Sequence, residues 1–148
     1  MIEAIPIELI WDRVQSVQLP DGETVWVDAA VAEVVATLNT IPNVRTSSSC
    51  SGHERMRASI LFYAADGDND ALMASPFVRA LAWMRDTQGD AITTRSVTRR
   101  LNGWAGTSGR DDDFELEFWG VGPDENRYPS YCAARQAVID LCKATAKR

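Results

Sequence analysis

The sequence has little of the chemistry that is typical of secreted or redox proteins. Its 148 residues include three cysteines, Cys50, Cys132 and Cys142, and one histidine, His53. The cysteines are odd in number, lie far apart and form no Cys-x-x-Cys pair, which argues against a disulfide framework and a thioredoxin-like motif. We therefore expect three reduced thiols.

Long apolar runs are also missing. No stretch approaches the roughly 20 residues that a membrane-spanning helix needs. The first residues, MIEAIPIELIWD, lack the basic flank and uninterrupted apolar stretch of a secretory leader. We expect a cytoplasmic protein without a membrane segment.

Positive charge is scarce, because 15 Lys and Arg face 21 Asp and Glu, giving a formal net charge of −6. Non-specific nucleic-acid binding depends on Lys and Arg neutralising phosphates, so extended binding to RNA or DNA is not expected. A small anionic ligand is compatible with this charge, since a few local groups can hold it against the overall field.

What the chain does contain is typical of an ordinary globular protein, with 45% hydrophobic and 24% charged residues. Its length suits one domain, which we assign to residues 1–148. Four tryptophans are expected to pack in the core or at its edge: Trp11, Trp26, Trp83 and Trp119.

The first half of the chain predicts a hairpin and then a helix. A Pro20-Asp21-Gly22 turn indicates a hairpin over residues 14–27. Asp28 is placed to cap a helix that Pro42 ends. The apolar face of this helix consists of Val31, Val34, Val35, Leu38 and Ile41.

The second half predicts a buried strand, two helices and a second hairpin. Residues 58–64 are almost wholly apolar, as in a central strand, and residues 75–89 form a helix with Ser75 as its cap. Residues 91–101 and 114–121 pair as a hairpin, and the closing helix over 128–148 has Pro129 early. The predicted fold is α/β (α+β): a single mixed, largely antiparallel sheet with about three helices packed on it.

The segment TSSSCSGHE lies between the first helix and the central strand, where open sheets commonly place ligands. Small residues allow backbone N–H groups to form an anion-binding nest, and hydroxyls can donate to phosphate or carboxylate oxygens. The alternative is that serine and glycine simply favour turns, with alternating serines facing outward along a strand. The predicted ligand-binding residues of this loop are Thr46, Ser47, Ser48, Ser49, Cys50, Ser51, Gly52 and His53.

Cys50 and His53 allow two further interpretations. His53 could take a proton from a nucleophilic Cys50, but a buried structural cysteine is the commoner case and is favoured here. The pair could also be half of a metal site, yet neither Cys132 nor Cys142 comes with a convincing further ligand, so no metal is predicted.

A second group of candidates lies in the glycine-rich stretch between the last two strands. An aromatic ring there could cover a base-like ligand while arginines hold its anionic groups. The alternative is a hairpin tip without a ligand. These candidates are Arg99, Arg100, Trp104 and Arg110.

The stretch LNTIPNVRTSSSCSGHE, followed by ASILFYA, resembles the tRNA wybutosine-synthesising protein 3 family. It also resembles short viral and bacterial proteins that carry Ser-Cys-Ser-Gly-His after a helix. The likeness covers residues 28–64, with His53 where the family usually has arginine. It implies S-adenosylmethionine as cofactor and methyl transfer to a modified guanosine of tRNA.

Three functions are therefore open. The leading hypothesis is a small-molecule binding protein for a nucleotide-like or phosphorylated ligand, which it would sequester as a signal. The second is an S-adenosylmethionine-dependent methyltransferase; no cofactor is expected otherwise. The third is a viral or bacterial inhibitor that acts through protein contacts. A homo-oligomer is compatible with each.

Overall fold

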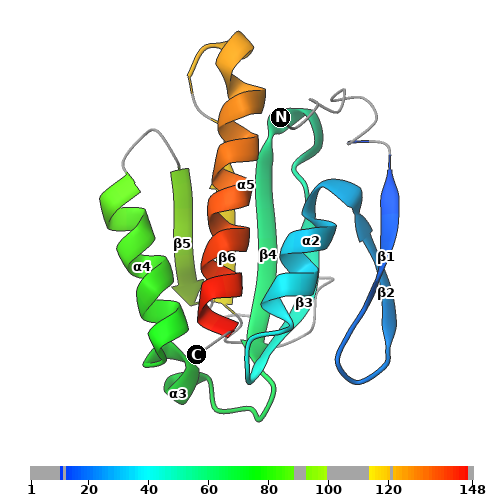
Figure 1. Cartoon of the computed structure of the whole chain (residues 1–148), viewed down its shortest axis with the longest axis vertical. Helices are drawn as coiled ribbons and strands as arrows, with labels where there is room; N and C mark the ends of the chain where they lie inside the picture. The colour runs from blue at the N-terminus through cyan, green and yellow to red at the C-terminus, as the bar shows by residue number, and fades with distance from the viewer. Residues whose placement is uncertain (1–10, 12, 89–92, 100–113, 121, 147–148) are drawn as a thin grey trace.

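A computed structural model of the protein describes residues 11, 13–88, 93–99, 114–120 and 122–146 (Figure 1). Its strands and helices interleave, and three long helices lie side by side over one face of a four-stranded sheet. The strands are β1 (Val14–Gln18), β2 (Thr24–Asp28), β3 (Val44–Cys50), β4 (Arg57–Ala64), β5 (Thr93–Arg99) and β6 (Phe114–Trp119). The helices are α2 (Ala29–Leu38), η1 (His53–Arg55), α3 (Asn69–Met73), α4 (Pro76–Gln88) and α5 (Asp124–Ala146).

The predicted largely antiparallel α/β fold is confirmed, but the described strands form two sheets rather than one. The order β3-β4-β6-β5 forms the larger sheet, and β1 and β2 form a separate hairpin. Helix α2 begins directly after Asp28, the last residue of β2. The chain therefore leaves the hairpin before β2 can pair with β3, and every described pairing is antiparallel.

The first hairpin is confirmed and packs its inner face on α2. Gly22 has φ of 88°, as the predicted turn requires, and its N–H donates to the Leu19 carbonyl over 2.9 Å. Apolar residues on this inner face and on α2 form a small cluster of their own. Its buried members are Val17, Leu19, Ala32 and Val35.

The main core lies between the larger sheet and the helices. Strand β4 is central, as predicted, between β3 and β6. Strand β6 buries Phe114, Leu116 and Phe118 while Glu115 and Glu117 are only half-buried, which confirms the predicted alternation. The Phe62 and Phe114 rings stack with centroids 5.3 Å apart, so aromatic packing joins neighbouring strands.

Helix boundaries differ from the prediction in two places. Helix α2 ends at Leu38, before Pro42. Ile41, which was predicted on the apolar face of the helix, lies in the following loop and is buried. Helix α5 begins at Asp124, so Pro129 lies inside it. One proline removes one helical hydrogen bond, and burial of Tyr131, Ala134 and Val138 outweighs that loss.

Helix α4 follows the prediction, since the Val78 N–H donates to the Ser75 hydroxyl over 3.3 Å at its start. Of the predicted packing tryptophans, Trp11 is buried, but Trp26 and Trp83 are 71% and 64% exposed. Trp26 lies on the outer side of a two-stranded sheet that has only one covered face. None of the described helices combines the length and apolar character needed to cross a bilayer.

Candidate functional site

The predicted ligand loop is mostly an edge strand. Thr46 to Cys50 belong to β3, and only Ser51, Gly52 and His53 form a turn. The backbone pairs with β4, with a bulge between Thr46 and Ser48. The sequence suggested a strand only as the alternative to a ligand loop, because serines are weak strand formers. Pairing with an apolar central strand overrides that preference.

Strand pairing divides the predicted site residues between two faces of the sheet. Residues directly opposite each other in a pair share a face. Ser49 lies opposite Ile60, on the core side, whereas Cys50 lies opposite Ser59 on the other side. The eight predicted residues therefore do not form one continuous surface.

Backbone donors of the segment are bonded within the protein. The Thr46 N–H donates to Asn39 Oδ1 over 3.2 Å, and the Ser51 N–H donates to Asp28 Oδ2 over 2.9 Å. The His53 N–H donates to the Ser51 hydroxyl over 3.2 Å. A ligand at this segment would thus meet side chains, not the N–H nest that the sequence suggested.

Ser51 anchors the turn. It is fully buried, and its N–H, hydroxyl and carbonyl oxygen all have protein partners. The carbonyl oxygen accepts a hydrogen bond from the Tyr131 hydroxyl of α5 over 2.9 Å. Burial raises the pKa of that phenol, so it remains a donor. Hydrogen bonds of Ser51 therefore connect the turn to both β2 and α5.

The turn has an unusual backbone. Gly52 has φ of 83°, and a Cβ at Gly52 would lie 2.2 Å from the Arg57 carbonyl oxygen. His53 and Met56 also have positive φ, 51° and 54°, although neither is glycine. Left-handed conformations of this kind cost about 1 kcal/mol or more and persist only where surrounding contacts hold them.

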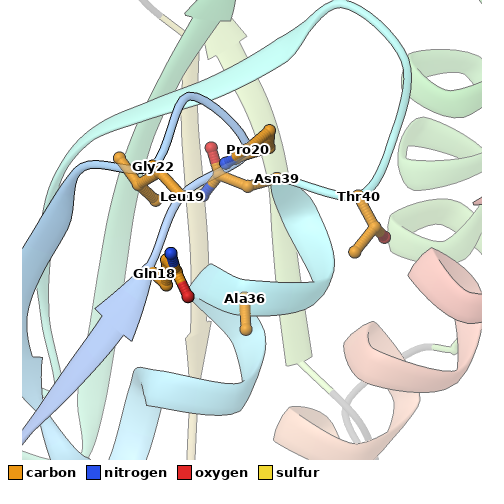
Figure 2. Close-up of a pocket in the computed structure, with 7 residues that line it drawn as sticks. All are labelled: Gln18, Leu19, Pro20, Gly22, Ala36, Asn39 and Thr40. Atoms are coloured by element: carbon orange, nitrogen blue, oxygen red, sulfur yellow. The ribbon is translucent and has the colours of Figure 1, made fainter.

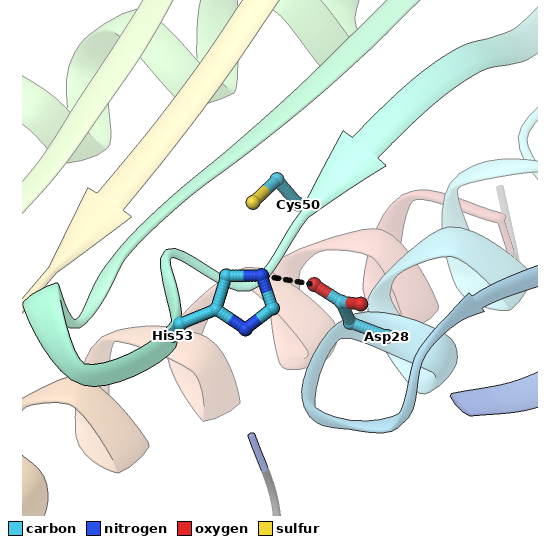
Figure 3. Close-up of side chains that lie close together, drawn as sticks. All are labelled: Asp28, Cys50 and His53. Atoms are coloured by element: carbon cyan, nitrogen blue, oxygen red, sulfur yellow. Dashed lines mark ion pairs between the residues drawn. The ribbon is translucent and has the colours of Figure 1, made fainter. Parts of the chain in front are cut away.

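The turn brings His53 to Cys50 and to a residue that the sequence did not identify as a site residue, Asp28. Donor atoms of these three side chains all lie within 4.8 Å of one another (Figure 3). His53 Nε2 is 3.7 Å from Asp28 Oδ2. Asp28 was predicted to cap α2; it occupies the N-cap position, but its carboxylate makes no cap bond and binds the Ser51 N–H instead.

The three side chains differ in exposure, and Cys50 and Asp28 lie on the same side of the His53 imidazole ring. Cys50 is exposed, so the expectation of a buried structural cysteine is wrong. The His53 and Asp28 side chains are 49% and 19% exposed. Figure 3 shows Nδ1 on the side of the ring away from both Cys50 and Asp28. The thiol and the carboxylate therefore approach the same nitrogen, Nε2.

Arginines surround the turn. Arg57 pairs with Glu117 over 2.9 Å, and its guanidinium lies 5.3 Å from the Trp119 ring centre. Arg127 of α5 donates to the Arg55 carbonyl over 2.9 Å, and the Arg55 side chain is exposed. Tertiary structure thus adds Arg127 to Arg55 and Arg57, which directly follow the segment in the sequence.

A different hollow lies at the other end of β3. A cavity of about 350 Å³ lies between the first hairpin and the end of α2 (Figure 2). An adjoining one of about 400 Å³ extends to Arg45. Their shared lining residues are Pro20, Asn39 and Thr40. Asn39 Nδ2 donates to Thr46 Oγ1 over 2.9 Å, so Thr46 belongs to this end and not to the Cys50 end.

Arg45, at the edge of this hollow, is bound to Asp21 of the hairpin turn over 2.6 Å. The Glu23 N–H and the Arg45 guanidinium hold the pKa of the Asp21 carboxyl below its ordinary value. The hollow therefore presents an ion pair and amide groups rather than an uncompensated cation.

The structure describes only one of the four remaining candidates. Arg100, Trp104 and Arg110 lie outside the described residues, and Arg99 is the last residue of β5. All three cysteines are free thiols, as predicted. Cys132 is half-buried; burial raises the pKa of the Cys142 thiol to about 12.

Comparison of the chain with protein-family models, curated proteins and solved structures finds no match. The resemblance to the wybutosine-synthesising family thus stays a hypothesis.

Proposed function

We propose that this chain is a small-molecule binding protein whose ligand is anionic, nucleotide-like or otherwise phosphorylated. The ligand is held at the Cys50 end of β3 and at η1. Binding without turnover would sequester it. The side chains that contact its charged groups are His53 and Arg55, with Arg127 beside them.

The observation that carries this proposal is the conformation of His53. Its positive φ of 51° is held by a turn whose backbone groups bond to Ser51, Gly52 and Met56. Strained residues of this kind gather at binding sites, because a rigid surround can hold a side chain ready for a ligand. The only histidine of the chain is thus held half-exposed beside Cys50.

An exposed aromatic ring supports a nucleotide-like ligand. Alternate residues of a strand share a face, so Trp26 lies on the same face of β2 as Asp28. Their Cα atoms are about 7 Å apart along the strand. Trp26 is 71% exposed, and an exposed indole is a stacking surface for a base. The sequence had suggested Trp104 for this role.

Calorimetry against a panel of small molecules tests the proposal. The panel holds linear and cyclic nucleotides, ADP-ribose-type molecules, S-adenosylmethionine and inorganic phosphate. We expect the protein to bind a phosphorylated member. The double variant His53→Ala, Arg55→Ala should bind it at least about tenfold more weakly, because each charged hydrogen bond contributes about 1.5–3 kcal/mol.

Two matched controls define the site. Arg79→Ala removes an exposed arginine of α4, and Trp83→Ala removes a tryptophan that is 64% exposed, against 71% for Trp26. Both variants should bind the ligand with the affinity of the wild type. Trp26→Ala should lower the affinity only for ligands that contain a base. Absence of heat from the wild type with every member, or equal affinity of all variants, overturns the proposal.

Mass spectrometry of the recovered ligand separates binding from turnover. Return of the ligand unchanged supports sequestration. Binding of S-adenosylmethionine alone, with methyl transfer to RNA, would instead favour the methyltransferase alternative.

A further inference from the structure

We propose that Asp28, Cys50 and His53 bind one zinc ion, with a fourth coordination position open to solvent. This inference goes beyond the proposed anion-binding function and does not depend on it. It rests on the convergence of three donors from the end of β2, the end of β3 and the η1 turn (Figure 3).

Distances between the donors suit a zinc ion. Zinc bonds of about 2.0–2.3 Å in a tetrahedron place neighbouring donors about 3.3–3.6 Å apart. His53 Nε2 and Asp28 Oδ2 are 3.7 Å apart, and no pair among the three donors exceeds 4.8 Å. The exposed Cys50 and half-exposed His53 side chains can close that remaining gap of about 1 Å by small rotations.

Orientation of the imidazole separates metal binding from a catalytic relay. In a Cys-His-Asp relay the nucleophile and the carboxylate contact different ring nitrogens. Here Cys50 and Asp28 approach the same side of the ring, and Nδ1 points away (Figure 3). Three donors that face one point make a coordination site, whereas they cannot pass a proton from thiol to carboxylate through the ring.

Two of the three donors already have the outer hydrogen bonds that metal ligands typically have. Asp28 Oδ2 accepts from the Ser51 N–H over 2.9 Å, which orients the carboxylate. Cys50 Sγ accepts from the Gly52 N–H over 3.4 Å, which orients the side chain. The His53 side chain is positioned through the backbone, because the backbone N–H of His53 donates to the Ser51 hydroxyl.

The donor set selects the type of metal ion. A thiolate and an imidazole favour zinc and disfavour Mg²⁺ and Ca²⁺, which require oxygen ligands. Three protein ligands leave the fourth position of a tetrahedral ion to water or to an oxygen of a ligand. Binding releases the Cys50 thiol proton to solvent, because the thiolate is the species that coordinates.

Titration with Co²⁺, a spectroscopic substitute for Zn²⁺, tests the site in tag-free protein without any nucleotide. We expect one ion per chain and a thiolate-to-cobalt charge-transfer band. The band should vanish in Cys50→Ser and persist in Cys132→Ser, a matched variant of the half-buried thiol in α5. A band that is missing from the wild type, or that survives in Cys50→Ser, overturns the proposal.

Competition with a chromophoric zinc chelator then measures Zn²⁺ affinity. Asp28→Asn and His53→Gln should each weaken it by about 10- to 100-fold or more, since loss of an outer-sphere partner alone has that effect. Asn at position 28 keeps an oxygen for the Ser51 N–H, and circular dichroism confirms folding. Equal zinc affinity of wild type and these variants would contradict the site. Nucleotide titrations of the metal-free protein test the anion proposal separately.

Discussion

The Tyr131 hydroxyl donates a hydrogen bond to the carbonyl oxygen of Ser51 over 2.9 Å, joining residues 80 positions apart. The Tyr131 ring packs edge-on to Trp11, with centroids 5.5 Å apart, and also contacts Phe118. One side chain of α5 therefore both fills the core and holds the turn that carries His53.

Tyr131→Phe is expected to keep this packing and lose the bond. The buried Ser51 carbonyl would then lack its partner, which costs about 1–3 kcal/mol of unfolding free energy. Urea denaturation measures the change. Tyr131→Ala should cost more, about 3–5 kcal/mol, because it also removes the ring. Equal unfolding midpoints of wild type and Tyr131→Phe would contradict the structural role of the hydroxyl.

Gly52→Ala is expected to destabilise the turn strongly. Its Cβ would lie 2.2 Å from the Arg57 carbonyl oxygen, at a φ of 83°. The matched control is Gly22→Ala, which has a similar φ of 88° but no atom within 4 Å of the new Cβ. The control should lose about 1 kcal/mol through backbone strain, and Gly52→Ala clearly more. Thermal denaturation that shows the same loss for both variants would disprove the close approach.

Asn39→Asp tests the junction of α2 and β3. The Asn39 amide donates to the Val35 carbonyl and to Thr46 Oγ1, and its oxygen accepts from the Thr46 N–H. An aspartate of the same shape has no amide donor and places a buried charge against a carbonyl oxygen. We expect a loss of about 1–3 kcal/mol in urea denaturation.

Asn126→Asp is the control for that change, because Asn126 is exposed in the first turn of α5. A new negative charge at a helix N-terminus is neutral or slightly stabilising. A loss of stability in Asn126→Asp that matches Asn39→Asp would indicate a general effect of added charge.

Alkaline pH is expected to destabilise the protein partly through Cys142. Burial raises the pKa of this thiol to about 12, with the Thr37 hydroxyl acting in the opposite direction. The folded pKa thus exceeds the unfolded value of about 8.5. The stabilisation is complete below about pH 8.5 and is lost as pH rises toward 12, by up to about 1.4 kcal/mol per pH unit.

Urea denaturation at pH 8 and pH 10.5 measures this effect. Cys142→Ala should show a smaller fall in unfolding free energy between the two pH values than the wild type does, whatever its stability at pH 8. Tyrosines and lysines titrate in both proteins, so the difference isolates the thiol. Identical falls would show that the Cys142 thiol ionises as readily in the folded protein as in the unfolded chain.

Local patterns in the sequence were sufficient for most of the fold. Proline and glycine mark the turn at Gly22, apolar spacing predicts α2 and α4, and alternation predicts the inner face of β6. These features depend on neighbours within a few residues, so the sequence shows them directly. Local patterns did not show that the β1-β2 hairpin forms a sheet of its own, separate from the four-stranded sheet. They also did not show that Trp26 is exposed.

The chemistry at the end of β3 was only half determined by the sequence. Cys50 and His53 lie three positions apart, so their proximity follows from the local chain. Asp28 precedes Cys50 by a helix and a loop, and its local pattern indicates a helix cap. Its carboxylate turns to the Ser51 N–H because the edge of β3 lies beside the end of β2. Only tertiary packing decides this, since it brings together groups that no local spacing relates.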